Sequence, residues 1–176
     1  RYAEAGKGVR LLNQNREEML YSFIISQNNN IPRIKSIISR ICGGLTQKRQ
    51  SSFGEYHPFP TSAQLAGAGS EFFKNAGAGY RDKYLAETSA RIVKEGFNLE
   101  KLDTPQLKRE LLTYLGVGAK VADCISLFGF SRRDSFPVDT WIEKVYREDF
   151  KGELTDRNKI CGYFTGLFGE YSGYIQ

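Results

Sequence analysis

The chain has 176 residues, of which 40% are hydrophobic, and its formal net charge is +5. That length suits one domain with a sizeable core, and the charge permits a polyanionic partner without requiring one. Three cysteines stand far apart, with no CxxC spacing and a single histidine, so neither a structural zinc site nor an iron–sulfur cluster is expected. Without a secretory signal or an apolar run of about 20 residues, the sequence favours an intracellular protein that does not enter a membrane.

The first half of the chain shows helical periodicity. Leu20, Phe23 and Ile24 mark a helix that starts near Glu17, and Pro32 opens a second one. The apolar stripe of this second helix consists of Ile34, Ile37, Ile38 and Ile41. Further on, Thr61 and Gln64 predict a capping box on a short helix, and Phe72 and Phe73 lie in another short helix. No segment alternates with period two, so we expect an all-α fold.

The run Asn28-Asn29-Asn30 separates the first two helices. Asparagine competes with helix formation by bonding to nearby backbone groups, so one interpretation is a turn that caps the next helix. A second interpretation is that the amides face a ligand, because an asparagine side chain both donates and accepts and can read a base edge. Arg33 would then lie on the same side.

A Gly-rich turn, Ala76-Gly77-Ala78-Gly79, precedes Tyr80 and Arg81 and leads into a long helix that runs through Glu95. An aromatic side chain followed by an arginine after such a turn can serve as a wedge and a phosphate or base contact. Tyr80 can equally be a core residue, and the spacing alone does not separate the two interpretations.

The stretch around Gly116-Val117-Gly118 predicts a helical hairpin. Thr104-Pro105 supplies a start signal for the first helix, with Thr104 as capping hydroxyl and Pro105 at the first helical position. A turn with two glycines exposes backbone N–H groups beside a helix N-terminus, which suits a phosphate. An ordinary corner between two helices is the alternative. The second helix starts near Lys120, which therefore lies in its first turn.

Pro137-Val138-Asp139-Thr140 precedes a further helix, and Asp139 is expected to cap it. The last helix carries an apolar face of Ile160, Phe164, Leu167 and Phe168. Because Lys120 lies at the start of one helix and Asp139 at the start of the next, this lysine and this carboxylate could meet in space.

Three separated motifs, SQNNNIPRI, AGAGYRDKYL and LGVGAKVADC, are followed by FPVDTW. Together they resemble the 8-oxoguanine DNA glycosylase family of the helix-hairpin-helix, Gly/Pro…Asp superfamily, from about Arg10 to Gln176. The resemblance implies a helical catalytic core over residues 1–176, with two helical lobes flanking an active-site cleft. It also implies a fragment of a longer chain, because the family carries an N-terminal β-rich domain and a further pocket aromatic beyond the position of Gln176.

The resemblance implies roles for individual residues. Lys120 and Asp139 match the catalytic pair, and Gly116 and Gly118 the hairpin that holds the DNA backbone. The residues around the orphaned cytosine would be Asn28, Arg33, Tyr80 and Arg81, and those of the base pocket Cys124 and Gln176. From its position on the apolar stripe alone, Cys124 could also be a small core residue.

No cofactor is expected to be required. The backbone carbonyls of Leu112, Tyr114 and Val117 match those that hold a monovalent cation, Na or K, in the family's hairpin. This chain departs from the family at Leu115, where proline is usual, and at Trp141, where histidine is common, so a phosphate contact at Trp141 is not implied.

The chemistry implied is base excision. A base inside a duplex must be flipped out before a side chain can reach it. Lys120 could then displace the base and form a Schiff base that permits β-elimination, with Asp139 stabilising the cationic transition state. The expected partner is double-stranded DNA containing 8-oxoguanine opposite cytosine, bound by a monomer. The alternatives are another glycosylase of the superfamily and a non-catalytic DNA-binding module.

Overall fold

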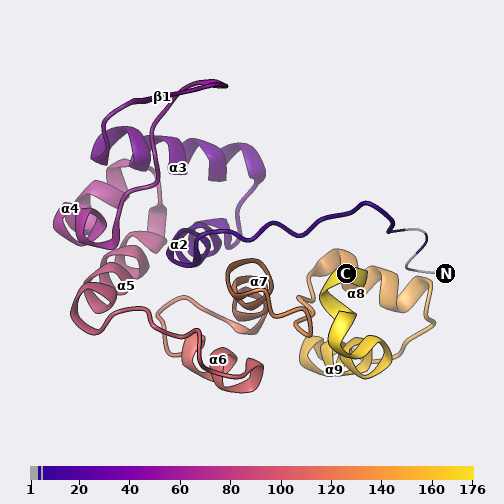
Figure 1. Ribbon diagram of the computed structural model, residues 1–176. Helices are drawn as coiled ribbons and strands as arrows, with labels where there is room; N and C mark the ends of the chain where they lie inside the picture. Colours follow the sequence, from indigo (N-terminus) through magenta and orange to yellow (C-terminus); the bar gives the residue numbers. More distant parts are fainter. Residues whose placement is uncertain (1–3, 5) are drawn as a thin grey trace. The chain divides into compact units, whose positions relative to one another are not determined.

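The structure is a computed structural model that describes residue 4 and residues 6–176. The chain divides into two compact units (Figure 1). Unit 2 comprises Glu17–Leu99 and Tyr114–Gly116, and unit 1 comprises Glu100–Thr113, Val117–Gln176 and the segment up to Arg16. Unit 2 contains α2 (Arg16–Ser26, of which Arg16 itself falls in unit 1), α3 (Ile31–Leu45), β1 (Arg49–Ser51), β2 (Gly54–Tyr56), α4 (Ser62–Asn75), η1 (Gly79–Arg81) and α5 (Asp82–Glu95). Unit 1 contains α6 (Thr104–Leu111), α7 (Ala119–Phe130), α8 (Thr140–Glu148), α9 (Arg157–Phe168), η2 (Gly169–Tyr171) and α10 (Ser172–Ile175).

The expected all-α architecture is confirmed, with one local correction. Residues 49–56 form a small antiparallel hairpin in which Arg49 pairs with Tyr56 and Gln50 with Glu55. No strand could be predicted here because both strands are three residues long and largely exposed, so no buried face imposes a period of two. None of the helices in the described part of the chain is long and apolar enough to cross a membrane.

The core of unit 2 is built from the apolar faces predicted for its first helices. Its large, fully buried side chains include Leu20, Ile24, Ile37, Ile41, Leu65, Phe73 and Leu85. The Tyr21 hydroxyl lies in this core and shares a 2.7 Å hydrogen bond with Ser62 Oγ. Ser62 in turn donates to Glu17, so the polar groups at the start of α4 are satisfied inside the unit.

The predicted capping box at the start of α4 is present. Thr61 accepts from the Gln64 amide, and the Gln64 side chain accepts from the Thr61 amide. The two short helices expected after Thr61 form one element that is broken at Gly69, whose φ of 72° and ψ of 170° are not helical. Glycine adopts this conformation without the steric cost that a Cβ would bring.

Unit 1 begins with the helix pair α6 and α7. The N-cap of α6 is Asp103, not Thr104, because the Asp103 carboxylate accepts from the Gln106 amide and Gln106 reaches back to the Asp103 N–H. The Thr104 hydroxyl instead donates to Asp134, at 2.9 Å. Gly116 follows the first helix with a φ of +84°, the left-handed conformation in which many helices end.

An ion pair that the sequence did not reveal ties α6 to α7. Lys108 of α6 pairs with Asp123 of α7, and the Asp123 side chain is only 10% exposed. The Cys161 thiol lies 3.9 Å from the other oxygen of Asp123. Burial raises the pKa of Asp123, while the charge of Lys108 and its hydrogen bond lower it. The lysine therefore stabilises a carboxylate that burial alone would destabilise.

An apolar cluster supports the remaining helices of unit 1. It consists of Phe136, Val138, Tyr146, Ile160 and Phe164. Phe136 and Phe164 stack with ring centroids 4.6 Å apart. Because Phe136 and Val138 belong to the segment that leads into α8, this cluster fixes the chain immediately before Asp139.

We predict that Lys108→Met lowers the free energy of unfolding by about 2–4 kcal/mol at neutral pH, because it leaves the Asp123 carboxylate buried without its cation. Without Lys108 the pKa of Asp123 rises further, and stability tied to a raised carboxyl pKa is lost as the pH rises through it. The deficit should therefore shrink as the pH is lowered toward 5, as measured by urea unfolding.

Two further variants control this prediction. Adding Asp123→Asn to Lys108→Met should recover part of the loss at neutral pH, because no buried charge remains. Lys48→Met removes a pair with Glu55 in which both side chains are more than half exposed, so it should have almost no effect. An equal loss for Lys48→Met and Lys108→Met would contradict a special role for the buried pair.

Candidate active site

The N-terminus of α7 carries the lysine of interest. Gly118 is the N-cap of α7 and offers no side chain to the first amide groups, and a Cβ added there would meet nothing within 4 Å. Unoccupied N–H groups at a helix start attract an anion. Lys120 lies in the first turn of the helix, as predicted, and is half-buried.

Cys124 lies one turn after Lys120 and is 4% exposed. Burial raises the pKa of the Cys124 thiol to about 11, while the charge of Lys120 and a hydrogen bond from it lower the pKa. The Asp139 carboxylate also acts on this thiol and raises its pKa. The structure therefore brings Lys120, Cys124 and Asp139 into one electrostatic neighbourhood, although they come from two helices.

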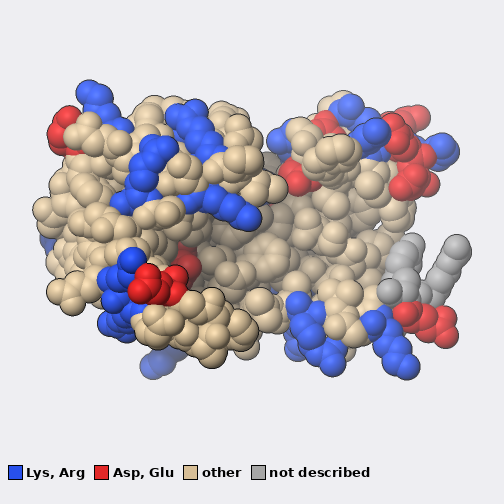
Figure 2. Space-filling model, turned by 90° about the horizontal axis from the view of Figure 1, so that it is seen from above, with Lys and Arg blue, Asp and Glu red and all other residues tan. Residues whose placement is uncertain are grey.

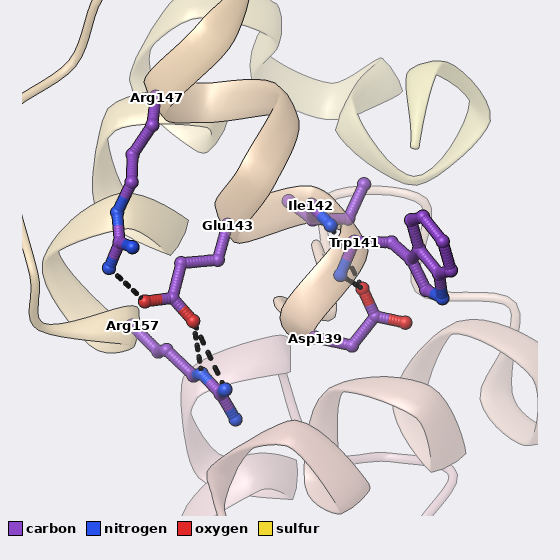
Figure 3. A network of polar contacts seen from close by, with 6 residues as sticks. All are labelled: Asp139, Trp141, Ile142, Glu143, Arg147 and Arg157. Atoms are coloured by element: carbon purple, nitrogen blue, oxygen red, sulfur yellow. Dashed lines mark hydrogen bonds and ion pairs between the residues drawn. The ribbon is translucent and has the colours of Figure 1, made fainter.

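Asp139 is the N-cap of α8, as expected. Its Oδ1 accepts hydrogen bonds from the amides of Trp141, at 2.9 Å, and Ile142, at 3.0 Å (Figure 3). Figure 3 shows the second carboxylate oxygen directed away from these amides. One oxygen thus fixes the side chain, and the other is available for chemistry.

A second carboxylate steadies the same helix. Glu143, one turn into α8, is only 17% exposed and bonds Arg157 through two contacts of 3.1 Å and also Arg147 (Figure 3). Arg157 opens α9, so this network joins the start of α8 to the start of α9. Of this network, only the helical i,i+4 spacing of Glu143 and Arg147 is visible in the sequence.

The residues expected around the orphaned base gather within unit 2. The guanidinium groups of Arg33 and Arg81 both lie beside Gly79. A Cβ added to Gly79 would be 3.8 Å from Arg33 Nη2 and 3.9 Å from Arg81 Nη1. The Arg81 guanidinium also lies 4.4 Å from the centre of the Tyr80 ring. Tyr80 is 51% exposed, which favours the wedge interpretation over a core residue.

The two arginines differ in their surroundings. Arg81 is 2% exposed, and its guanidinium donates to the carbonyls of Gln27, Asn28 and Ala78. Arg33 is exposed and makes one 3.3 Å contact, with the Gly77 carbonyl. In this arrangement Arg33 is the arginine open to a ligand, and Arg81 is the one that holds the backbone around it.

The turn interpretation of the asparagine run is confirmed for two of its residues. Asn30 caps α3 by accepting from the Arg33 amide at 3.0 Å, and Asn29 bonds the Ile25 carbonyl at 3.1 Å. Asn28 is exposed and left-handed, with a φ of 43°. A ligand contact by the Asn28 side chain stays a prediction.

The two residues expected in the base pocket have different described neighbours. Gln176 lines a mostly apolar cavity of about 490 Å³ with residues that include Phe136, Ile142 and Phe164. Cys124 lies one turn after Lys120 on α7. Their shared role in a base pocket stays a prediction.

Trp141 and the hairpin carbonyls complete the predicted set. Trp141 follows the cap of α8, is 72% exposed and lies 6.0 Å from the Lys144 ammonium. Leu112 is the C-cap of α6, where helical carbonyls run out of amide partners, and the side chains of Tyr114 and Val117 are buried.

No protein-family model matches the chain. The N-glycosylase/DNA lyase OGG1 of Arabidopsis thaliana is 34% identical over 185 residues, which cover 97% of this chain and 50% of that protein. The N-glycosylase/DNA lyase of Saccharomyces cerevisiae is 35% identical over 161 residues, covering 82% of this chain and 43% of that protein. The chain thus spans about half the length of the curated relatives it matches.

A solved structure gives the same assignment. The Clostridium acetobutylicum 8-oxoguanine glycosylase/lyase, in complex with double-stranded DNA containing cytosine opposite 8-oxoG, superposes with a TM-score of 0.91 at 36% identity. The match covers 99% of this chain and 61% of that one. The chain therefore belongs to the 8-oxoguanine DNA glycosylase/lyase family of the helix-hairpin-helix superfamily.

Proposed function

We propose that this chain supplies the catalytic core of a bifunctional enzyme that excises 8-oxoguanine from duplex DNA and then cuts the strand. The observation that carries the proposal is that Lys120 and Asp139 both act on the buried Cys124 thiol, at a helix start where N–H groups favour a phosphate. A non-catalytic DNA-binding hairpin needs neither residue. The relatives are named N-glycosylase/DNA lyase, and the Clostridium relative is named 8-oxoguanine glycosylase/lyase.

Lys120 is the nucleophile in this proposal. Its amine attacks C1′ of the damaged nucleoside, the bond from C1′ to the base breaks, and the base leaves with the bonding electrons. Loss of the amine proton and opening of the sugar ring then give a Schiff base. Removal of a C2′ proton expels the 3′ phosphate by β-elimination. Attack requires the amine in its neutral form.

Asp139 stabilises the positive charge that develops on the sugar as the base departs. The oxygen that accepts from the Trp141 and Ile142 amides holds the carboxylate in place before the substrate arrives. No reorganisation of the carboxylate is then needed during the reaction. We assign Cys124 to one face of the flipped purine. Because burial keeps its thiol protonated, it offers a neutral, polarisable surface next to the charged pair.

Unit 2 would hold the duplex at the point where the base has been flipped out. Tyr80 fills the gap, the exposed Asn28 and Arg33 meet the orphaned base, and Arg81 fixes their backbone. A guanidinium can serve two acceptors on a base edge, which suits cytosine opposite the lesion. The DNA in the complex of the Clostridium relative contains cytosine opposite 8-oxoG.

The charge distribution of unit 2 supports a DNA partner. Helix α3 carries Arg33, Lys35 and Arg40 and no acidic residue, and Lys48 and Arg49 follow it. Figure 2 shows lysine and arginine side chains over the face of this unit that carries α3. Basic side chains on one face attract phosphates and make binding depend on salt.

We further propose that the enzyme acts as a monomer without a required cofactor, and that the carbonyls of Leu112, Tyr114 and Val117 hold a Na or K ion. Carbonyl oxygens past the end of a helix are suitable ligands for such a cation. Gln176 would approach the Watson–Crick edge of the flipped base.

We predict that Lys120→Gln binds duplexes containing 8-oxoguanine but cuts none, because an amide cannot form a Schiff base. Sodium borohydride should trap the parent chain on the DNA and leave the variant untrapped, as seen on denaturing gels. Binding measured by fluorescence anisotropy should change by less than about threefold. A trapped Lys120→Gln variant would exclude this lysine as the nucleophile.

Asp139→Asn should separate the two tasks of this side chain. Asparagine caps a helix about as well as aspartate, so the unfolding free energy should stay within about 0.5 kcal/mol, whereas Asp139→Ala should lose about 1 kcal/mol. Base release in single-turnover assays should fall by roughly 100-fold or more in both variants, because both lack the charge. Full activity in Asp139→Asn would assign the residue to capping alone.

Arg33→Ala should relax the choice of opposite base without unfolding the chain. The variant keeps the amide that Asn30 caps, and Arg33 is exposed, so its unfolding free energy should change by less than about 0.5 kcal/mol. Cutting of 8-oxoguanine opposite C, A, G and T should show a preference for C in the parent. That preference should fall about tenfold in the variant. Unchanged preference would remove Arg33 from base recognition.

A further inference from the structure

Tyr84, on the first turn of α5, has no role in the site described so far. Its ring lies directly against Gly116 of the hairpin. A Cβ added to Gly116 would lie 2.4 Å from Tyr84 Cδ2 and 2.9 Å from Cγ, closer than real Cβ contacts allow. Gly116 also has a φ of +84°, so both its conformation and this contact exclude a side chain. The hairpin therefore rests on the Tyr84 ring.

The same ring meets Tyr80. The Tyr80 and Tyr84 centroids are 5.8 Å apart and the rings are inclined at 76°, an edge-to-face arrangement. Such pairs contribute beyond simple burial and hold the two rings in a defined orientation. Tyr80 is half exposed, so its contacts with Tyr84 and with the Arg81 guanidinium restrict the direction in which it projects.

A continuous series of contacts follows within unit 2. Gly116 packs on Tyr84, Tyr84 on Tyr80, and Tyr80 on Arg81, which is bonded to the Asn28 carbonyl. The series joins the turn that would receive the DNA backbone to the groups that would receive the orphaned base. In the sequence these residues lie in three segments, the second and third being separated by some thirty residues.

We propose that Tyr84 is a positioning residue that couples the hairpin at Gly116 to the wedge at Tyr80, so that seating the DNA backbone and inserting Tyr80 favour each other. The proposal rests on the function proposed above. Tyr84 touches neither the sugar nor the base. Its ring sets the spacing between hairpin and wedge, and the tight contact with Gly116 leaves no room for a larger side chain.

The test is a double-variant cycle on binding. Tyr84→Phe, Tyr84→Leu, Tyr80→Leu and the double leucine variant are titrated with two duplexes, one undamaged and one carrying an abasic-site analogue opposite cytosine. The ring is retained in Tyr84→Phe, which should bind both duplexes like the parent. Tyr84→Leu should bind the abasic duplex about 3–10-fold more weakly. Its affinity for the undamaged duplex, which needs no wedge, should change by less than twofold.

In the double variant, the losses of affinity for the abasic duplex from the two leucine substitutions should not add. Once Tyr80 is leucine there is no wedge to position, so adding Tyr84→Leu should weaken abasic binding by less than about twofold. Tyr56→Leu, at an exposed tyrosine of β2 in the same unit, serves as the matched control and should bind like the parent. Urea unfolding of every variant separates lost affinity from lost folding.

Three results would overturn the proposal. In the first, Tyr84→Leu weakens both duplexes in the same proportion, which indicates a structural role. In the second, the two leucine substitutions are additive. In the third, the parent shows no preference for the abasic duplex, because there is then no insertion to position. A parent that prefers the abasic duplex but fails borohydride trapping would instead contradict the proposed function and leave the coupling intact.

Discussion

The chemistry proposed for this chain depends on a carboxylate that does two things at once. Asp139 has one oxygen bonded to the amides of Trp141 and Ile142 and a second oxygen outside those bonds. A side chain on a flexible segment would lose rotational freedom when it met a transition state, and this one has already lost it on folding. The apolar cluster around Phe136 and Phe164 and the ion pairs of Glu143 keep the start of α8 in place, so the cap remains formed.

The role proposed for unit 2 makes a different demand. There an opened duplex would meet groups that can make hydrogen bonds and that do not bond to one another beforehand. Arg81 donates its hydrogen bonds to main-chain carbonyls, including that of Asn28, and so holds the turn at Asn28 in place. Arg33 and Tyr80 stay exposed. A buried cation among carbonyls has lower cost than one in an apolar core, because the carbonyls of Gln27, Asn28 and Ala78 accept hydrogen bonds from its two terminal nitrogens.

Much of the fold could be predicted because helices have local sequence signals, such as apolar periodicity and capping residues. Ile34, Ile37 and Ile41 give the stripe of α3, and Gly116 marks the end of a helix by a conformation that few other residues adopt. Local signals failed where two candidates compete. Asp103 and Thr104 can each cap α6, and the choice is settled by Gln106 standing three residues after Asp103. Gly69 breaks α4 although glycine is tolerated inside many helices. For the candidate site, the sequence motifs suggested which residues belong to it. The motifs could not show which of these residues are buried, such as Arg81, or which residues pair between helices, such as Lys108 with Asp123.

The manner in which Arg81 is held has a consequence for how such a protein can change over generations. Its guanidinium bonds the carbonyl oxygens of Gln27 and Asn28, which every amino acid possesses. Substitutions at these two positions can therefore alter what the turn offers to a base without releasing the arginine, provided that the left-handed backbone at Asn28 is kept. The backbone atoms that hold Arg81 therefore differ from the side-chain atoms proposed to meet the opposing base, so the proposed base preference can change while the turn keeps its structure.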